Sequence, residues 1–204
     1  MKNPEICAIF AIGPNNVIGI GDKMPWHSKQ DFYHYKQITK GYPCIFGERT
    51  FFGLPKYPLK DRLNIVVSYN YPDHNIVLCT EKNKLDEESY FYTGSYIEAP
   101  SVLEAIDFAS NYSKIFICGG SSIYKYCLEN DLVDTIYLTE VESEDLREKI
   151  YKDPSAYIKF PIDIQKYLAK NWSYEDIYYD PYVLPKEDND ILVKFTKWTK
   201  CKNR

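Results

Sequence analysis

A carboxylic acid at the start of a predicted helix is the first group in this sequence that could carry out chemistry. An apolar run at residues 6–12 is followed by a glycine-bearing loop, by Met24-Pro25-Trp26 and then by Asp31, within a helical pattern at 28–39. Asp31 and Tyr35 are four residues apart, so they share one face of that helix. A carboxylate beside aromatic rings can serve as a general acid or base. A solvated acid that the helix dipole favours is the alternative.

Two strand-to-helix turns are suited to binding phosphate. Gly47-Glu48-Arg49-Thr50 follows an apolar run at 44–46, and Gly119-Gly120-Ser121-Ser122 ends the run at 114–118. Free amides at the start of a helix, together with the Thr50 hydroxyl, can hold a phosphate, and glycines let the backbone approach a dinucleotide. Ordinary connecting turns are the alternative reading of both segments.

The elements that must position these groups alternate between helices and strands. Helical patterns occur at 28–39, 101–111 and 121–129, with Ser28 and Ser101 as N-caps. Short apolar runs, typical of strands covered on both faces, occur at 6–12, 44–46, 64–68, 76–79, 114–118, 135–141, 172–179 and 191–198. The pattern predicts a single α/β domain with a mixed, mostly parallel central sheet flanked by helices, and a C-terminal antiparallel hairpin.

Two segments interrupt this alternation. Residues 80–100 are polar and rich in Tyr, and residues 142–159 are strongly charged. We expect both to be surface insertions made of solvated loop, with a binding role as the alternative.

Composition and charge exclude several classes of protein. The chain has 204 residues, of which 45% are hydrophobic and 26% charged, and this fits one globular domain. A net charge of -4 without clustered Lys and Arg argues against a nucleic-acid binder, despite the 20 Tyr. No stretch is long enough to span a bilayer, and residues 6–12 lack the flanks of a signal peptide. The Cys and His show no metal-like spacing, so we expect reduced thiols, no metal and a cytoplasmic protein.

The order of these motifs resembles that of the dihydrofolate reductases. The likeness runs from about residue 6 to residue 141, resumes at Phe160-Pro161 and breaks at the two predicted insertions. Each motif is common by itself, but five in register are specific. They are Met24-Pro25-Trp26 with Asp31, residues 44–50, residues 54–68, residues 115–124 and residues 136–139.

The resemblance implies reduction of 7,8-dihydrofolate to tetrahydrofolate by hydride transfer from NADPH, which supplies one-carbon metabolism and thymidylate synthesis. Asp31 would bind the 2-amino and N3 edge of the pterin, with a pKa raised by desolvation, and Trp26 would order the nearby water. Arg62 would fork onto the α-carboxylate of the glutamate tail. The implied substrate-binding residues are Ile9, Phe32, Tyr35, Leu54, Leu59, Arg62, Cys118 and Thr139.

The resemblance also implies a nicotinamide cofactor site. The backbone at Ala11 and Ile18 would hold the nicotinamide, the loop at 13–24 would close as a lid, and the Gly119–Gly120 peptide bond would be cis. The implied cofactor-binding residues are Ala11, Ile18, Gly47, Glu48, Arg49, Thr50, Ser68, Gly119, Gly120, Ser121, Ser122, Ile123 and Tyr124.

Three departures from the family pattern bear on this reading. Glu48 stands where the family often carries a basic residue, and Tyr69 where a basic or small polar residue is common, so we expect NADPH to be preferred by a reduced margin, with NADH not excluded. The residues that could compensate are Arg49, Ser68, Lys82 and Lys84. The third departure is Ile158-Lys159, which replaces an acidic residue and a Thr.

The same residues distinguish this function from two alternative functions. A reductase of the same fold that acts on a pyrimidine in riboflavin synthesis would lack the arrangement of Trp26, Asp31 and Arg62. A catalytically inactive folate- or nucleotide-binding module is the second alternative, and the intact site residues argue against it. For the active enzyme we expect a monomer that binds antifolate inhibitors and neither nucleic acid nor membrane.

Overall fold

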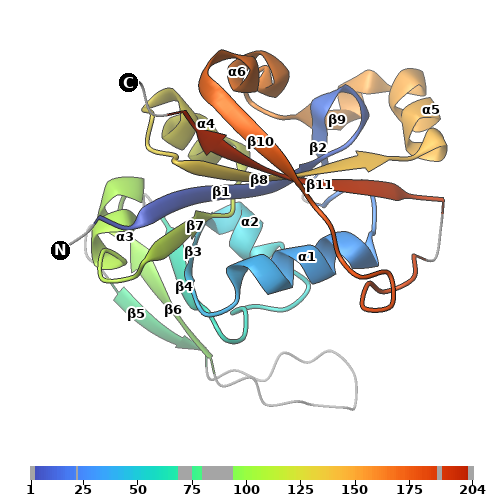
Figure 1. The fold of residues 1–204 in the computed structure, drawn as a ribbon. Helices are drawn as coiled ribbons and strands as arrows, with labels where there is room; N and C mark the ends of the chain where they lie inside the picture. The colour runs from blue at the N-terminus through green and yellow to red at the C-terminus, as the bar shows by residue number, and fades with distance from the viewer. Residues whose placement is uncertain (1–2, 22, 69–74, 80–93, 188–189, 202–204) are drawn as a thin grey trace, which may run out of the picture.

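The computed structural model describes residues 3–21, 23–68, 75–79, 94–187 and 190–201 (Figure 1). Within this part of the chain one sheet of nine strands has the order β10-β11-β8-β1-β7-β3-β4-β6-β5. Its strands are β1 (Glu5–Ile12), β3 (Pro43–Gly47), β4 (Leu63–Val67), β5 (Asn75–Cys79), β6 (Gly94–Ala99), β7 (Lys114–Ile117), β8 (Thr135–Glu142), β10 (Trp172–Ile177) and β11 (Leu192–Lys200). A small second sheet pairs β2 (Val17–Ile20) with β9 (Tyr157–Lys159).

The strand directions confirm the predicted α/β class. β1 pairs in parallel with β7 and β8, and β3 pairs in parallel with β4 and β7. β11 runs antiparallel to β8 and to β10, which is the predicted C-terminal hairpin. Because the central strands are parallel, their carboxyl ends lie along one edge of the sheet, where α/β proteins bind ligands.

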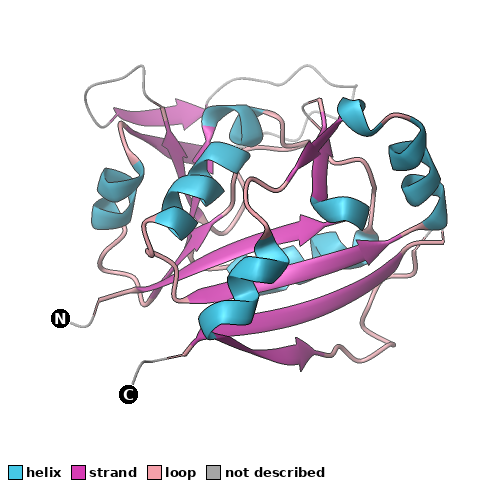
Figure 2. Cartoon of the chain, turned by 90° about the horizontal axis from the view of Figure 1, so that it is seen from above, coloured by secondary structure: helices cyan, strands magenta, loops and turns pink. Residues whose placement is uncertain are grey.

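Helices cover both faces of the sheet (Figures 1 and 2). They are α1 (Lys29–Thr39), α2 (Glu48–Phe52), α3 (Val102–Phe108), α4 (Ser121–Glu129), α5 (Glu144–Lys152) and α6 (Ile164–Asn171), with short 3-10 turns η1 (Pro14–Asn16) and η2 (Pro154–Ala156). Alternate residues of a strand point to opposite faces. Ala8 and Phe10 accordingly pack in the core that α3, α4 and α6 cover, whereas Ile9 packs in the core beneath α1 and α2.

The two predicted helix N-caps, Ser28 and Ser101, are confirmed. The N–H of Asp31 donates to the Ser28 hydroxyl over 3.0 Å at the start of α1. The N–H of Glu104 donates to the Ser101 hydroxyl over 3.2 Å at the start of α3. α3 ends at Phe108, earlier than predicted.

The prediction that both segments are solvated loop was wrong where the structure describes them, although most residues of 142–159 are exposed. Residues 80–93 lie outside the described part of the chain, but 94–99 form β6 inside the main sheet, with Tyr96 and Ile97 buried. In the other segment, α5 buries Leu146 and Ile150, and β9 pairs with β2. Both segments pair or pack with distant residues. Their polar composition gives no indication of that pairing, so the sequence alone did not predict it.

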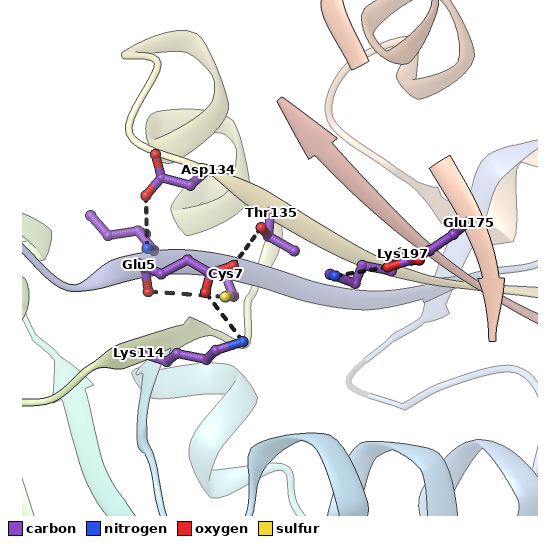
Figure 3. Close-up of polar contacts among 8 residues, drawn as sticks. Glu5, Cys7, Lys114, Asp134, Thr135, Glu175 and Lys197 are labelled. Atoms are coloured by element: carbon purple, nitrogen blue, oxygen red, sulfur yellow. Dashed lines mark hydrogen bonds and ion pairs between the residues drawn. The ribbon is translucent and has the colours of Figure 1, made fainter. Parts of the chain in front are cut away.

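A polar network at the amino ends of β1, β7 and β8 ties these strands together (Figure 3). Glu5 accepts a hydrogen bond of 2.6 Å from Thr135 and pairs with Lys114 over 3.2 Å. Burial opposes ionisation of Glu5, but these hydrogen bonds and the Lys114 charge hold its pKa below the ordinary value. Asp134 accepts from the Ile6 N–H over 2.9 Å. Because the network lies at the opposite end of the strands from the predicted site, we assign it a structural role.

Candidate active site

Asp31 lies in the first turn of α1 with only 8% of its surface exposed. Burial raises its pKa to about 6, a hydrogen bond from Thr139 of β8 opposes that rise, and the charge of Glu187 adds to it. A carboxyl group with a pKa in this range can take up and release a proton near neutral pH. The structure therefore brings together Asp31 and Thr139, two residues that the resemblance assigned to the site.

Trp26 is buried and packs in a third cluster, with Ala11 partly buried against it. Its indole Nε1 has no hydrogen-bond partner among the described residues. A buried N–H is seldom left unpaired, so this donor is available to a water molecule or a ligand. Gly13 lies close to the same ring, because a Cβ there would be 2.9 Å from Trp26.

An apolar wall forms from residues that the sequence assigned to substrate. Ile9, Tyr35, Leu54, Leu59 and Cys118 all belong to the core cluster beneath α1 and α2. The Tyr35 hydroxyl donates to Cys118 Sγ over 3.3 Å. Phe32 lies outside this cluster and is 39% exposed, with its ring centroid 5.3 Å from that of His27.

Arg62 is held at the carboxyl end of α1. Its Nε donates to Thr39 Oγ1 over 2.8 Å, its Nη1 to the Lys60 carbonyl over 2.7 Å, and its Nη2 to the Lys36 carbonyl over 3.4 Å. Its guanidinium carbon lies 5.7 Å from the centroid of the Tyr35 ring. A guanidinium has five N–H donors, so three such bonds leave donors for an anion.

The two glycine turns lie side by side at the carboxyl edge of the sheet. The Gly47 N–H donates to the Gly119 carbonyl over 2.7 Å, and a Cβ on Gly120 would lie 2.7 Å from Thr50 Oγ1. α2 begins at Glu48 and α4 at Ser121, so amides of both first turns are directed to one region. The Gly119–Gly120 bond is cis, as predicted.

Tyr124 links the second turn to the central strand. Gly119 has a φ of +102°, and a Cβ there would lie 2.9 Å from the Tyr124 ring, so the close approach requires glycine. The Tyr124 hydroxyl donates to the Ile9 carbonyl over 2.7 Å. Ile123, the preceding residue of the helix, is buried in the same core.

Comparison with known proteins identifies the family. The sequence profile of the family described as dihydrofolate reductase matches residues 5–161. The chain belongs to the dihydrofolate reductase family. As a member it is an oxidoreductase that reduces dihydrofolate to tetrahydrofolate.

Individual relatives agree with this assignment. The chain is 26% identical to the dihydrofolate reductase of Candida albicans, over 98% of this chain and 100% of the relative. It is 31% identical to the type 9 dihydrofolate reductase of Escherichia coli, over 66% of this chain and 68% of the relative. A solved dihydrofolate reductase from Enterococcus faecalis, complexed with NADP(H) and RAB-propyl, has the same fold, with a TM-score of 0.63, 22% identity and 96% of each chain covered.

The adenosine end of the expected cofactor site is acidic in this family member. The Ser68 hydroxyl donates to Glu48 over 2.9 Å. Burial, followed by the charge of Glu48, raises the pKa of Glu98 on β6. Ser68 is therefore engaged by Glu48, while Tyr69, Lys82 and Lys84 lie outside the described residues.

The segment 13–24, predicted to close as a lid, contains the strand β2. Val17 pairs with Lys159 and Gly19 with Ile158. Gly19 is buried beside Ile158, and Gly21 has a φ of +56° in the turn that follows. The third departure, Ile158-Lys159, thus lies where β9 holds the segment before Trp26. The pairing joins segments about 140 residues apart, which no local pattern reveals.

Glu187 is the site residue that sequence reasoning missed. It comes from the loop between β10 and β11 and contacts the first turn of α1, 159 residues from Ser28. The segment around it is turn-rich and polar, and nothing in its composition points to α1.

Proposed function

We propose that Asp31 handles the proton in the reduction of 7,8-dihydrofolate to tetrahydrofolate, with NADPH as the hydride donor. The observation that carries this assignment is a buried carboxyl with a pKa of about 6 in the first turn of α1, hydrogen-bonded to Thr139 of β8. A buried carboxyl can hydrogen-bond to the amino and N3 edge of a pterin, and a pKa in this range lets it take up and release a proton there.

The chain fits a dinucleotide at the two glycine turns. Gly120 leaves no room for a Cβ beside Thr50, so backbone amides can come close to a phosphate there. Gly47, Arg49, Thr50, Ser121 and Ser122 would hold the phosphates, and Ala11 and Ile18 the nicotinamide. NADPH, when bound, supplies the hydride that reaches C6 of the pterin.

The chain's own residues then manage the proton and the water. Protonated Asp31 supplies the proton that reaches N5 through solvent. The Nε1 N–H of Trp26, which has no partner among the described residues, would order a water molecule for this transfer. Thr139 keeps the Asp31 carboxyl oriented from β8. Ile9, Phe32, Tyr35, Leu54, Leu59 and Cys118 would contact the pterin and its benzoyl extension, and Arg62 the glutamate tail.

Loss of reduced-nicotinamide absorbance with dihydrofolate, and with NADPH or NADH, tests this function. We expect turnover with NADPH. An inactive binding module would bind the ligands without turnover, and a pyrimidine reductase would turn over only a pyrimidine substrate. We further propose a cytoplasmic monomer that binds antifolates, which gel filtration and titration with a diaminopyrimidine would check.

Asp31→Asn tests the proton role. The fold should survive while turnover near neutral pH falls by roughly two orders of magnitude or more, because a general acid–base group is lost. Activity should recover in part at low pH, where substrate is already protonated. Turnover close to wild type at neutral pH would mean that Asp31 serves only as an acidic residue in the first turn of α1.

A further inference from the structure

The loop between β10 and β11 packs on the amino-terminal half of α1 (Figure 1). The Tyr179 hydroxyl lies 2.8 Å from His34 Nδ1, and Gln30 Nε2 donates to the Pro185 carbonyl over 3.1 Å. The buried His34 ring stacks on Phe195 of β11 at a centroid distance of 4.4 Å. The C-terminal hairpin and the helix that carries Asp31 are therefore joined by specific contacts.

Glu187 of this loop binds the first turn of α1. Its Oε2 accepts from the Lys29 N–H over 2.9 Å, and its Oε1 accepts from the Gln30 N–H over 3.0 Å and from the Ser28 hydroxyl. The Ser28 hydroxyl in turn accepts from the Asp31 N–H over 3.0 Å. One hydrogen-bonded chain therefore runs from Glu187 through Ser28 to the backbone of Asp31.

We propose that Glu187 is a positioning residue for the reaction at Asp31, a role that rests on the function proposed above. Two carboxylates share one helix amino terminus, where backbone amides favour negative charge. Glu187 accepts hydrogen bonds from the N–H groups of Lys29 and Gln30. It therefore competes with Asp31 for the stabilisation of negative charge at this end of the helix. The result is a helix end held in place and an Asp31 that holds a proton more readily.

The charges that face Asp31 agree in sign with this role. Burial raises its pKa first, the Thr139 hydrogen bond from β8 lowers it, and the Glu187 charge raises it. Tyr124 from α4 also faces Asp31, but burial raises the pKa of that phenol well above its ordinary value, so it stays neutral. Among the described groups that act on Asp31, Glu187 supplies the like charge.

Glu187→Gln keeps the shape of the side chain and removes its charge. The alkaline limb of the kcat/KM profile should move to lower pH by roughly half a pH unit or more, because Asp31 loses a like charge. Turnover at neutral pH should fall about threefold or more as a consequence. Asp190→Asn removes the same charge from an exposed position of the same loop and should leave the profile unchanged.

A measurement without turnover keeps the test decisive. Carbon-13 labelling of the Asp carboxyls gives a resonance for Asp31, identified by its loss in Asp31→Asn, and its midpoint should fall in Glu187→Gln. An unmoved midpoint in folded protein, whether or not turnover drops, would overturn the electrostatic role and leave Glu187 a structural cap. If instead Asp31→Asn retained full turnover, the proposed function itself would fail.

Discussion

Asp31 is the residue in which function and stability conflict. Its pKa rises from 3.8 to about 6 in the fold, and burial is the largest cause. A carboxyl whose pKa is raised binds more protons when folded than when unfolded, so stability falls as pH rises through the window from about 4 to 6. The group that can exchange a proton at neutral pH is thus also one that weakens the folded state there.

Asp31→Asn should therefore stabilise the protein at neutral pH. Above a pH of about 6, where Asp31 is ionised, its raised pKa corresponds to a loss of about 3 kcal/mol in the free energy of unfolding. A neutral amide removes that loss. Near pH of about 4 both side chains are neutral, so the gain should vanish. Urea unfolding of the two proteins at both pH values would measure this; a gain that did not change with pH would show that charge is not its origin.

Glu48 places a carboxylate at the adenosine end of the expected cofactor site. Its carboxylate already accepts from Ser68, and Glu98 lies close enough for the two charges to interact. A 2′-phosphate beside such a carboxylate is disfavoured by about 1 kcal/mol in a solvent-like dielectric. Glu48→Arg should tighten NADPH binding by at least about fivefold and leave NADH nearly unchanged, as measured by fluorescence titration. Equal changes for both cofactors would mean that Glu48 does not face the 2′-phosphate.

Two capped helix starts were predicted from sequence because their cause is local, whereas α5 and α6, capped by Ser143 and Asp163, were missed. Ser101 with Glu104 and Ser28 before α1 cap the helices as predicted, and the strands at 6–12 and 135–141 follow from apolar runs. β2, β6 and β9 were missed, because each takes its place from a partner elsewhere in the chain. Glu187 was missed for the same reason, since its partners lie across the fold rather than along the chain.

Ser28→Ala tests how much the capped helix end matters. Loss of an N-cap hydroxyl costs about 1 kcal/mol, and here it also cuts the link between Glu187 and the Asp31 backbone. We expect that loss in urea unfolding together with lower turnover. Ser101→Ala removes a comparable cap from α3, away from Asp31, and should cost similar stability without lowering turnover at saturating NADPH. Equal turnover in both variants would mean that the α1 cap has no role in positioning Asp31.

The whole molecule assembles its site from segments that are far apart in sequence. Asp31 and Thr139 meet across α1 and β8, and the glycine turns after β3 and β7 meet because these strands are neighbours. The resemblance to a family supplied the residue list, while the pairing of strands supplies the reason that the residues converge. A ligand that bridges both turns should therefore stabilise the fold as a unit, since it binds only the folded state.

NADPH should raise the Tm of the protein by roughly 5–10 °C at a concentration about a hundredfold above its Kd, since such binding contributes about 2.7 kcal/mol. Gly120→Ala should remove most of that rise, because the new Cβ would lie 2.7 Å from Thr50 Oγ1 and would push the two turns apart. Gly53→Ala is the matched control: Gly53 is exposed at the end of α2 with an ordinary φ of -80°, so the added methyl should leave the NADPH-dependent rise intact. A full rise in Gly120→Ala, measured by scanning calorimetry at equal cofactor concentration, would show that the cofactor does not bridge the two turns.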